Sequence, residues 1–287
     1  MPAFQELILR RIMLGQRQPD AAPAWAHTDH WRRYIQWQYE SSAKLFAKFP
    51  NFEIRGKTVL EIGCGTGGRS AWLAGAGASK VTAIDINADE IQVARTLVPE
   101  LFPREARNVT FEVSQEERPL SIGRFDVVVL VDCLEHVVSP PGILRLAYQY
   151  TDDGGSCFAG LQGWFQKSGS HFGIPFVNLF FSDEAILNAQ RWWVSRPEYV
   201  PTRFDSNPPV DRWRGLYDLR QRPGEYLNKI TIGEIRKLLK YTEFPRRALH
   251  VIGFGGRNPL IKTINVLRRV PLLQEVFHSY IVLELRR

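Results

Sequence analysis

Cysteine is scarce in this chain, and long apolar runs are missing. Its 287 residues include three cysteines, Cys64, Cys133 and Cys157, whose spacing fits neither a disulfide framework nor a metal cluster. No stretch is long and apolar enough to span a bilayer, and the first residues lack the apolar core and cleavage site of a signal peptide. These absences argue against a disulfide-rich secreted protein or a membrane-spanning one, and they predict a cytoplasmic location.

Charge is unevenly distributed along an otherwise ordinary composition. Hydrophobic residues make up 44% and charged residues 23%, as in a typical globular protein, and the net charge is +7. Residues 229–287 carry 12 Lys and Arg against 4 Glu, whereas residues 1–228 are almost neutral. A basic region of this kind is either a solvated face or a surface that attracts an anionic substrate, a membrane or a nucleic acid.

The segment VLEIGCGTGG at 59–68 joins a buried strand to a glycine hinge. Gly63, Gly65 and Gly67 allow a sharp turn and close approach of a ligand, and the helix that follows points its amide groups into the site. Gly63, Gly65 and Gly68 also fit the G-x-G-x-x-G pattern of dinucleotide-binding proteins. Glu61 distinguishes a dinucleotide site from an S-adenosylmethionine site, because its charge would repel a pyrophosphate but attract the ammonium group of S-adenosylmethionine. The segment therefore predicts an S-adenosylmethionine site.

Two further segments support this interpretation. KVTAIDIN at 80–87 is a strand ending in Asp85, which lies 24 positions after Glu61, where an acid can accept hydrogen bonds from ribose hydroxyls. FDVVVLVDCLEHV at 125–137 is a nearly continuous apolar strand followed by an acidic turn.

Together these motifs resemble the class I S-adenosylmethionine-dependent methyltransferases, well over residues 53–160 and more loosely toward the C-terminus. The resemblance implies a Rossmann-like α/β fold: a sheet of seven strands, parallel except for one antiparallel strand, flanked by helices. Many relatives have Gly-Asp after the third strand, where this chain has Ser114-Gln115, but the Gln115 amide oxygen can still accept a hydrogen bond from adenine. The expected cofactor-binding residues are Glu61, Gly63, Cys64, Gly65, Gly67, Asp85, Ile86, Gln115 and Asp132.

Strand-like and helix-like segments alternate along the middle of the chain, which predicts a parallel sheet covered on both faces. Four regions follow: an N-terminal helical cover at 1–52, a cofactor-binding core at 53–163, an aromatic-rich insertion at 164–228 that by resemblance forms a substrate lid, and a completion of the sheet at 229–287. The expected strands are 57–62, 80–85, 109–113, 125–131, 155–160, 246–254 and 279–287, the last antiparallel by resemblance.

Histidines near the strand ends are candidates for the base that a hydroxyl acceptor requires. His136 follows the fourth strand and His171 lies in the loop after the fifth; either could instead be a structural histidine. Asp132, Glu135 and His136 stand at i, i+3 and i+4, which resembles the acidic E-x-x-E-H of ubiquinone-pathway O-methyltransferases, where the matching residues are associated with a divalent metal. Metal-independent relatives also carry LEHV, so we expect no metal. If a metal does bind, Asp132, Glu135 and His136 are the candidate ligands.

The function expected from the sequence is methyl transfer from S-adenosylmethionine to a hydroxyl of a small molecule: a sugar, a lipid-linked saccharide or an aromatic metabolite. The alternatives are an RNA methyltransferase, suggested by the basic end of the chain, and a non-catalytic module that keeps the fold. VDCL stands where a nucleic-acid enzyme would carry D/N-P-P-Y/F, so a nucleic-acid partner is not expected. The apolar and basic segment NPLIKTINVLRRVPLL could rest on a membrane surface, and the sequence gives no oligomeric state.

Overall fold

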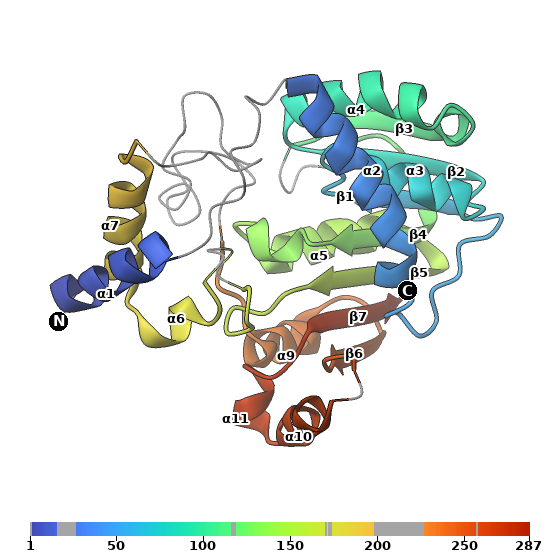
Figure 1. Ribbon diagram of the computed structural model, residues 1–287. Coiled ribbons are helices and arrows are strands. Elements are labelled where there is room, and N and C mark those ends of the chain that lie inside the picture. Colours follow the sequence, from blue (N-terminus) through green and yellow to red (C-terminus); the bar gives the residue numbers. More distant parts are fainter. Residues whose placement is uncertain are drawn as a thin grey trace.

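The computed structural model describes residues 2–15, 27–115, 119–169, 171, 174–197, 227–256 and 258–287. A seven-stranded sheet runs through its centre in the order β3-β2-β1-β4-β5-β7-β6, with helices on both faces (Figure 1). The first five strands pair in parallel, and β7 is antiparallel to both β5 and β6. The predicted fold is therefore confirmed. The strands are β1 (Thr58–Ile62), β2 (Lys80–Asp85), β3 (Val109–Val113), β4 (Phe125–Val131), β5 (Thr151–Leu161), β6 (Arg246–Ile252) and β7 (Tyr280–Arg286).

Side-chain caps fix where several helices begin. The Asn87 side chain accepts from the backbone of Asp89 and Glu90 at the start of α4, and Thr231 forms a reciprocal capping box with Glu234 at the start of α9. The helices of the sheet layers are α2 (His27–Phe46), α3 (Gly68–Gly75), α4 (Ala88–Leu101), α5 (Pro140–Tyr150) and α9 (Ile232–Tyr241), with short 3₁₀ turns η1 (Glu105–Asn108) and η2 (Leu134–His136).

Each face of the sheet has its own apolar layer. Leu60, Val128 and Leu283 are fully buried on the side covered by α5 and α9. Val59, Val127 and Val282 are fully buried on the other side. The alternation along β1, β4 and β7 follows from the two-residue repeat of a strand, and burial on both faces explains why these strands are almost wholly apolar.

The two N-terminal helices pack against different parts of the protein. Helix α2 lies against the glycine hinge, since a Cβ on Gly68 would lie 2.4 Å from the Ile35 carbonyl oxygen. Helix α1 (Pro2–Gly15) instead packs on α7 (Asp183–Val194), where Leu9 and Met13 are buried. Leu9 and Met13 pack on the insertion, and the role of residues 1–52 as a cover of the cofactor-binding core stays a prediction. Phe4, Leu7, Ile8 and Ile12 of α1 are exposed.

The aromatic insertion has a small apolar core of its own in its described part. Trp164 and Trp193 are buried there, together with residues of α6 (Val177–Phe180), α7 and α1. These two tryptophans are therefore core residues of the insertion. Trp213 lies outside the described residues, as does the rest of 198–226, and the lid function stays a prediction.

The last segment before β7 forms two short helices, α10 (Pro259–Leu267) and α11 (Pro271–Gln274), beside the edge strand β6 (Figure 1). In the described part of the chain, no helix combines the length and apolarity needed to cross a bilayer.

Candidate active site

The glycine hinge turns back on β2 directly after β1. The backbone amides of Gly63 and Cys64 both donate to the Ile84 carbonyl oxygen, at 2.8 and 3.1 Å. Gly63, Gly65 and Gly67 have φ values of +77°, +53° and +79°, a left-handed conformation that other residues adopt at a cost. Gly67 caps α3, so the free amides of that helix open into the hinge.

Neighbouring side chains pack closely against the glycines of the hinge. A Cβ on Gly67 would lie 2.5 Å from the Phe111 ring, and one on Gly65 would lie 2.8 Å from Glu90 Oε2. Packing therefore excludes a side chain at Gly67, and the left-handed backbone disfavours one at Gly65. We call this hinge the cradle; it is where the sequence predicts that the adenosyl and methionyl groups of S-adenosylmethionine bind.

Glu61 lies at the centre of this cradle with its side chain 1% exposed. Burial raises the pKa of its carboxyl to about 7, although the hydrogen bond from the Ser70 hydroxyl and the nearby Arg69 guanidinium oppose the rise. A buried carboxylate is costly unless it meets a positive charge. A bound ammonium group would supply that charge.

Asp85 ends β2 and holds the hinge from the other side. Its Oδ2 accepts from Gly65 N at 2.8 Å and its Oδ1 accepts from Asn87 N at 2.9 Å. Burial raises the pKa of its carboxyl, and these backbone hydrogen bonds oppose the rise. Each oxygen keeps a second lone pair, so Asp85 can shape the hinge and still accept from a ribose. Ile86 follows it directly, and the backbone of Ser114, beside Gln115, donates to the Asp85 carbonyl oxygen.

Asp132, after β4, is held by two residues that the motifs did not indicate. Arg69 Nη2 donates to its Oδ2 at 2.6 Å, and the Tyr280 hydroxyl donates to its Oδ1 at 2.8 Å. Its φ is +51° and its amide donates to the Gly160 carbonyl oxygen. No sequence motif marks Arg69, and Tyr280 reaches the site through the pairing of β7 with β5.

Lys48, from the segment after α2, completes this charged group. Its Nζ lies 4.1 Å from the centre of the Tyr280 ring, within the range of a cation–π contact. Burial lowers the pKa of the Lys48 ammonium, while the Asp132 carboxylate opposes that change. Two cationic side chains, Arg69 and Lys48, therefore lie near the Asp132 carboxylate.

The two histidines predicted as candidate bases lie side by side. The ring centroids of His136, in η2, and His171, in the loop after β5, are 5.0 Å apart at an interplanar angle of 58°. Glu135 joins them: one possible ligand atom from each of the three residues lies within 4.8 Å of the others. The structure thus places His171, rather than the expected Asp132, with Glu135 and His136.

Glu135 is deeply buried beside the histidines, 4% exposed. Its Oε2 has no hydrogen-bond partner among the described residues. Burial, and then the neighbouring Asp132 carboxylate, raise the pKa of Glu135 to about 8. An oxygen of the Glu135 carboxylate could serve as a ligand of a divalent cation, and the two imidazoles are ligands that suit a transition metal.

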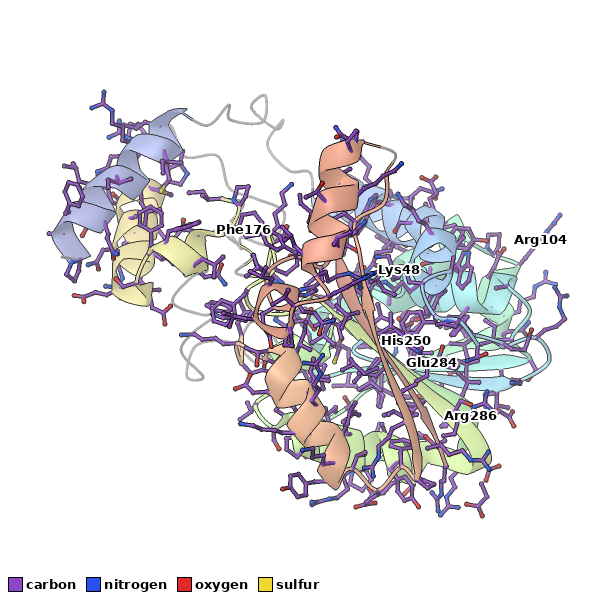
Figure 2. The ribbon with its side chains drawn as sticks, turned by 90° about the horizontal axis from the view of Figure 1, so that it is seen from below. Lys48, Arg104, Phe176, His250, Glu284 and Arg286 are labelled. Atoms are coloured by element: carbon purple, nitrogen blue, oxygen red, sulfur yellow. The ribbon has the colours of Figure 1, made fainter. Side chains whose placement is uncertain are left out.

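The other described histidine side chains have structural positions. His250 faces Glu284 across β6 and β7 (Figure 2), with Nε2 3.7 Å from Oε2, and Glu284 also accepts from Asn51. His278 is fully buried, and its Nδ1 lies 2.9 Å from the Gln274 carbonyl oxygen.

A cavity of about 450 Å³ adjoins the turn that carries His136. It lies between α5 and α9, and its lining includes Val138, Pro140, Leu144 and Asn228. Asn228 is tied to the turn, because its Nδ2 donates to the carbonyl oxygens of Leu134 and Val137. The lining combines apolar side chains with charged ones, among them Arg145, Glu234 and Lys237, and the cavity is of a size that holds a small organic molecule.

Residues 29–207 match a family model described as a methyltransferase domain. The chain belongs to this methyltransferase family. It is an S-adenosylmethionine-dependent class I enzyme, as the cradle around Glu61 also indicates. Solved structures with the same fold include an S-adenosylmethionine-dependent methyltransferase from Mesorhizobium loti, with 18% identity and a TM-score of 0.50 over 88% of this chain and 98% of that one. A phosphoethanolamine N-methyltransferase from Haemonchus contortus, in complex with S-adenosylmethionine, has 14% identity and a TM-score of 0.52 over 89% of this chain and 56% of that one.

Curated relatives at higher identity match a shorter segment of this methyltransferase. A ubiquinone biosynthesis O-methyltransferase from Pseudomonas paraeruginosa is 40% identical over 106 residues, and the corresponding protein from Pseudomonas entomophila is 38% identical over 106. In both cases the match covers 37% of this chain and 44% of the relative, so the chain spans less than half of their length.

Proposed function

We propose that this methyltransferase transfers the methyl group to a hydroxyl of a small molecule, and that His136 and His171 receive the hydroxyl proton. The observation that carries the proposal is the histidine pair at the carboxyl end of the sheet, beside the cofactor cradle. A hydroxyl must lose its proton as the methyl arrives, and imidazole is suited to this near neutral pH. The Pseudomonas relatives are O-methyltransferases, which supports the same class of acceptor.

The described residues divide the work of such a transfer. The cofactor is bound and oriented by the hinge amides, Glu61 and Asp85. Between cofactor and acceptor, the Arg69–Asp132–Tyr280 group holds the end of β4 in place. Methyl transfer is an in-line displacement, so alignment and exclusion of water supply much of the rate. When bound, S-adenosylmethionine supplies the electrophilic methyl. One histidine then accepts the proton while the other positions it.

The cavity beside η2 favours an acceptor with an apolar part. Val138, Pro140 and Leu144 offer apolar contacts, and Asn228, which is bonded to the turn that carries His136, offers a polar one. An aromatic ring or a lipid tail satisfies this pattern better than a free sugar does.

The test is an acceptor screen with methyl-labelled S-adenosylmethionine. Phenols and catechols with and without alkyl tails, sugars, primary amines and transfer RNA are incubated with the full chain, and each labelled product is identified by mass and by NMR of the new methyl group. O-methyl products from the phenols are expected. Labelling confined to amines or to RNA would contradict the proposed acceptor class.

A further inference from the structure

Helix α10 presents apolar side chains to solvent. Val266 is 57% exposed, Val270 49% and Leu272 80%. They lie on α10, on the turn after it and on α11, the two short helices beside β6 at one edge of the molecule (Figure 1). We call these three residues the α10–α11 strip. Soluble proteins seldom expose neighbouring apolar residues without a binding role.

Two polar residues of this segment, Asn265 and Arg268, face the protein. The Asn265 side chain both accepts from Phe254 N at 3.0 Å and donates to its carbonyl oxygen at 2.9 Å. Arg268 donates to the Val251 carbonyl oxygen. An ordinary surface helix buries its apolar face and exposes its polar one. Here Asn265 and Arg268 attach the helix to the end of β6, while Val266 and Val270 stay exposed.

The charged residues of the segment that carries the strip are basic. Lys262 and Arg269 are exposed on either side of Val266. Residues 244–274 contain six Lys and Arg and no Asp or Glu. The next acid along the chain, Glu275, accepts from the amides of Ile232 and Gly233 at the start of α9, and therefore does not face the strip as a free negative charge.

From this combination we infer that the α10–α11 strip docks on an anionic lipid surface. Aliphatic side chains enter the boundary between headgroups and acyl chains, and flanking Lys and Arg bind the anionic headgroups. The partner is a membrane rather than a nucleic acid, because the strip offers aliphatic side chains and no aromatic ring on which a base would stack. This docking is independent of the acceptor proposed above.

Vesicle sedimentation with the full chain tests the inference. Vesicles of phosphatidylcholine alone are compared with vesicles containing about one third phosphatidylglycerol, at low and at physiological salt. The protein is expected to sediment with the anionic vesicles, and less so at the higher salt. Val266→Ser with Leu272→Ser should lower the bound fraction severalfold, and Lys262→Glu with Arg269→Glu should lower it about tenfold or more.

Matched controls keep the outcome interpretable. Lys80→Glu with Arg104→Glu makes the same charge change on the far edge of the sheet, where Figure 2 shows Arg104, and Tyr241→Ser removes another exposed apolar residue, 86% exposed. Both should bind as the unmodified chain does, and all variants should keep S-adenosylmethionine affinity, which reports folding. Absence of binding to anionic vesicles, or equal loss in the controls, overturns the inference. Two other results would also overturn it. One is that the chain forms a dimer and the Val266 and Leu272 changes dissociate it; the other is that the chain binds RNA and only the charge reversals abolish that binding.

Discussion

The imidazole rings of His136 and His171 lie with their centroids 5.0 Å apart, although the two residues come from different connections of the fold. His136 lies on a 3₁₀ turn fixed to the end of β4. His171 is brought there by the loop after β5, in a left-handed conformation with φ +54°. Such a conformation is costly for a residue other than glycine and is often found at functional sites.

The histidine pair leads to the first prediction. His136→Ala is expected to lower kcat by about two to four orders of magnitude, since general base catalysis contributes that factor. His171→Ala should have a smaller effect if it only positions His136. Titration calorimetry should give unchanged S-adenosylmethionine affinity in both. His250→Ala is the matched control, because it removes a histidine that faces Glu284 away from the cradle.

Near-normal rates in both variants, with an unchanged pH profile, would contradict the base assignment. Alignment alone, or the Asp132 carboxylate, would then have to account for the transfer.

Chelation gives the second prediction, which separates base catalysis from metal assistance. If Glu135, His136 and His171 act without an ion, activity should survive exhaustive treatment with a chelator. Glu135→Gln removes the carboxylate but keeps the shape of the side chain, and it should then retain most of the rate. Loss of activity on chelation, with recovery on adding Mg²⁺, Mn²⁺ or Zn²⁺, would instead assign the three residues as metal ligands.

The sheet and its cofactor edge could be predicted from the sequence because they depend on local patterns. Apolar runs such as those of β1 and β4 fit only strands buried on both faces, and the glycines after β1 occupy the left-handed conformations that their type allows. Glu61 and Asp85 follow, since the carboxyl ends of parallel strands meet at one edge.

The residues that the sequence did not reveal depend on long-range geometry. Tyr280 reaches Asp132 only because β7 inserts beside β5, and Arg69 has no motif that distinguishes it from an ordinary surface arginine. The grouping of His171 with Glu135 depends on the course of a loop, which local propensity does not fix. Helix α1 shows the same limit: its periodicity predicts a helix, but the residues it buries are decided by α7.

The hydrogen bonds around Asp132 give the third prediction. Asp132→Asn leaves the partly buried Arg69 guanidinium without its counter-charge and should destabilise the fold by about 3 kcal/mol or more. Tyr280→Phe removes one hydrogen bond and should cost about 1 kcal/mol. Urea unfolding measures both, with exposed Tyr241→Phe as the control. If the asparagine variant is no less stable than the phenylalanine variant, the Arg69 ion pair contributes little to the fold.

The last prediction follows from the buried carboxyl of Glu61, whose pKa rises from 4.5 to about 7 in the folded chain. Because the folded state holds this proton more tightly than the unfolded one, Glu61 favours folding below about pH 4.5, and this contribution is lost as the pH rises to 7. Glu61→Gln should remove that part of the pH dependence of unfolding, which thermal melts between pH 5 and pH 7.5 would measure.

Cofactor binding should have the opposite pH dependence. An ammonium group beside Glu61 favours the carboxylate, so at low pH binding must first release the Glu61 proton. Calorimetry should therefore show S-adenosylmethionine affinity falling about tenfold between pH 7 and pH 5.5, a range in which the ammonium group of the ligand stays charged. 5′-Methylthioadenosine lacks that ammonium group and serves as the control, with little change expected. In Glu61→Gln, S-adenosylmethionine should bind more weakly and with no such dependence. Equal pH dependence for the two ligands would mean that Glu61 does not face the ammonium group, and the charge argument for the cradle would fail.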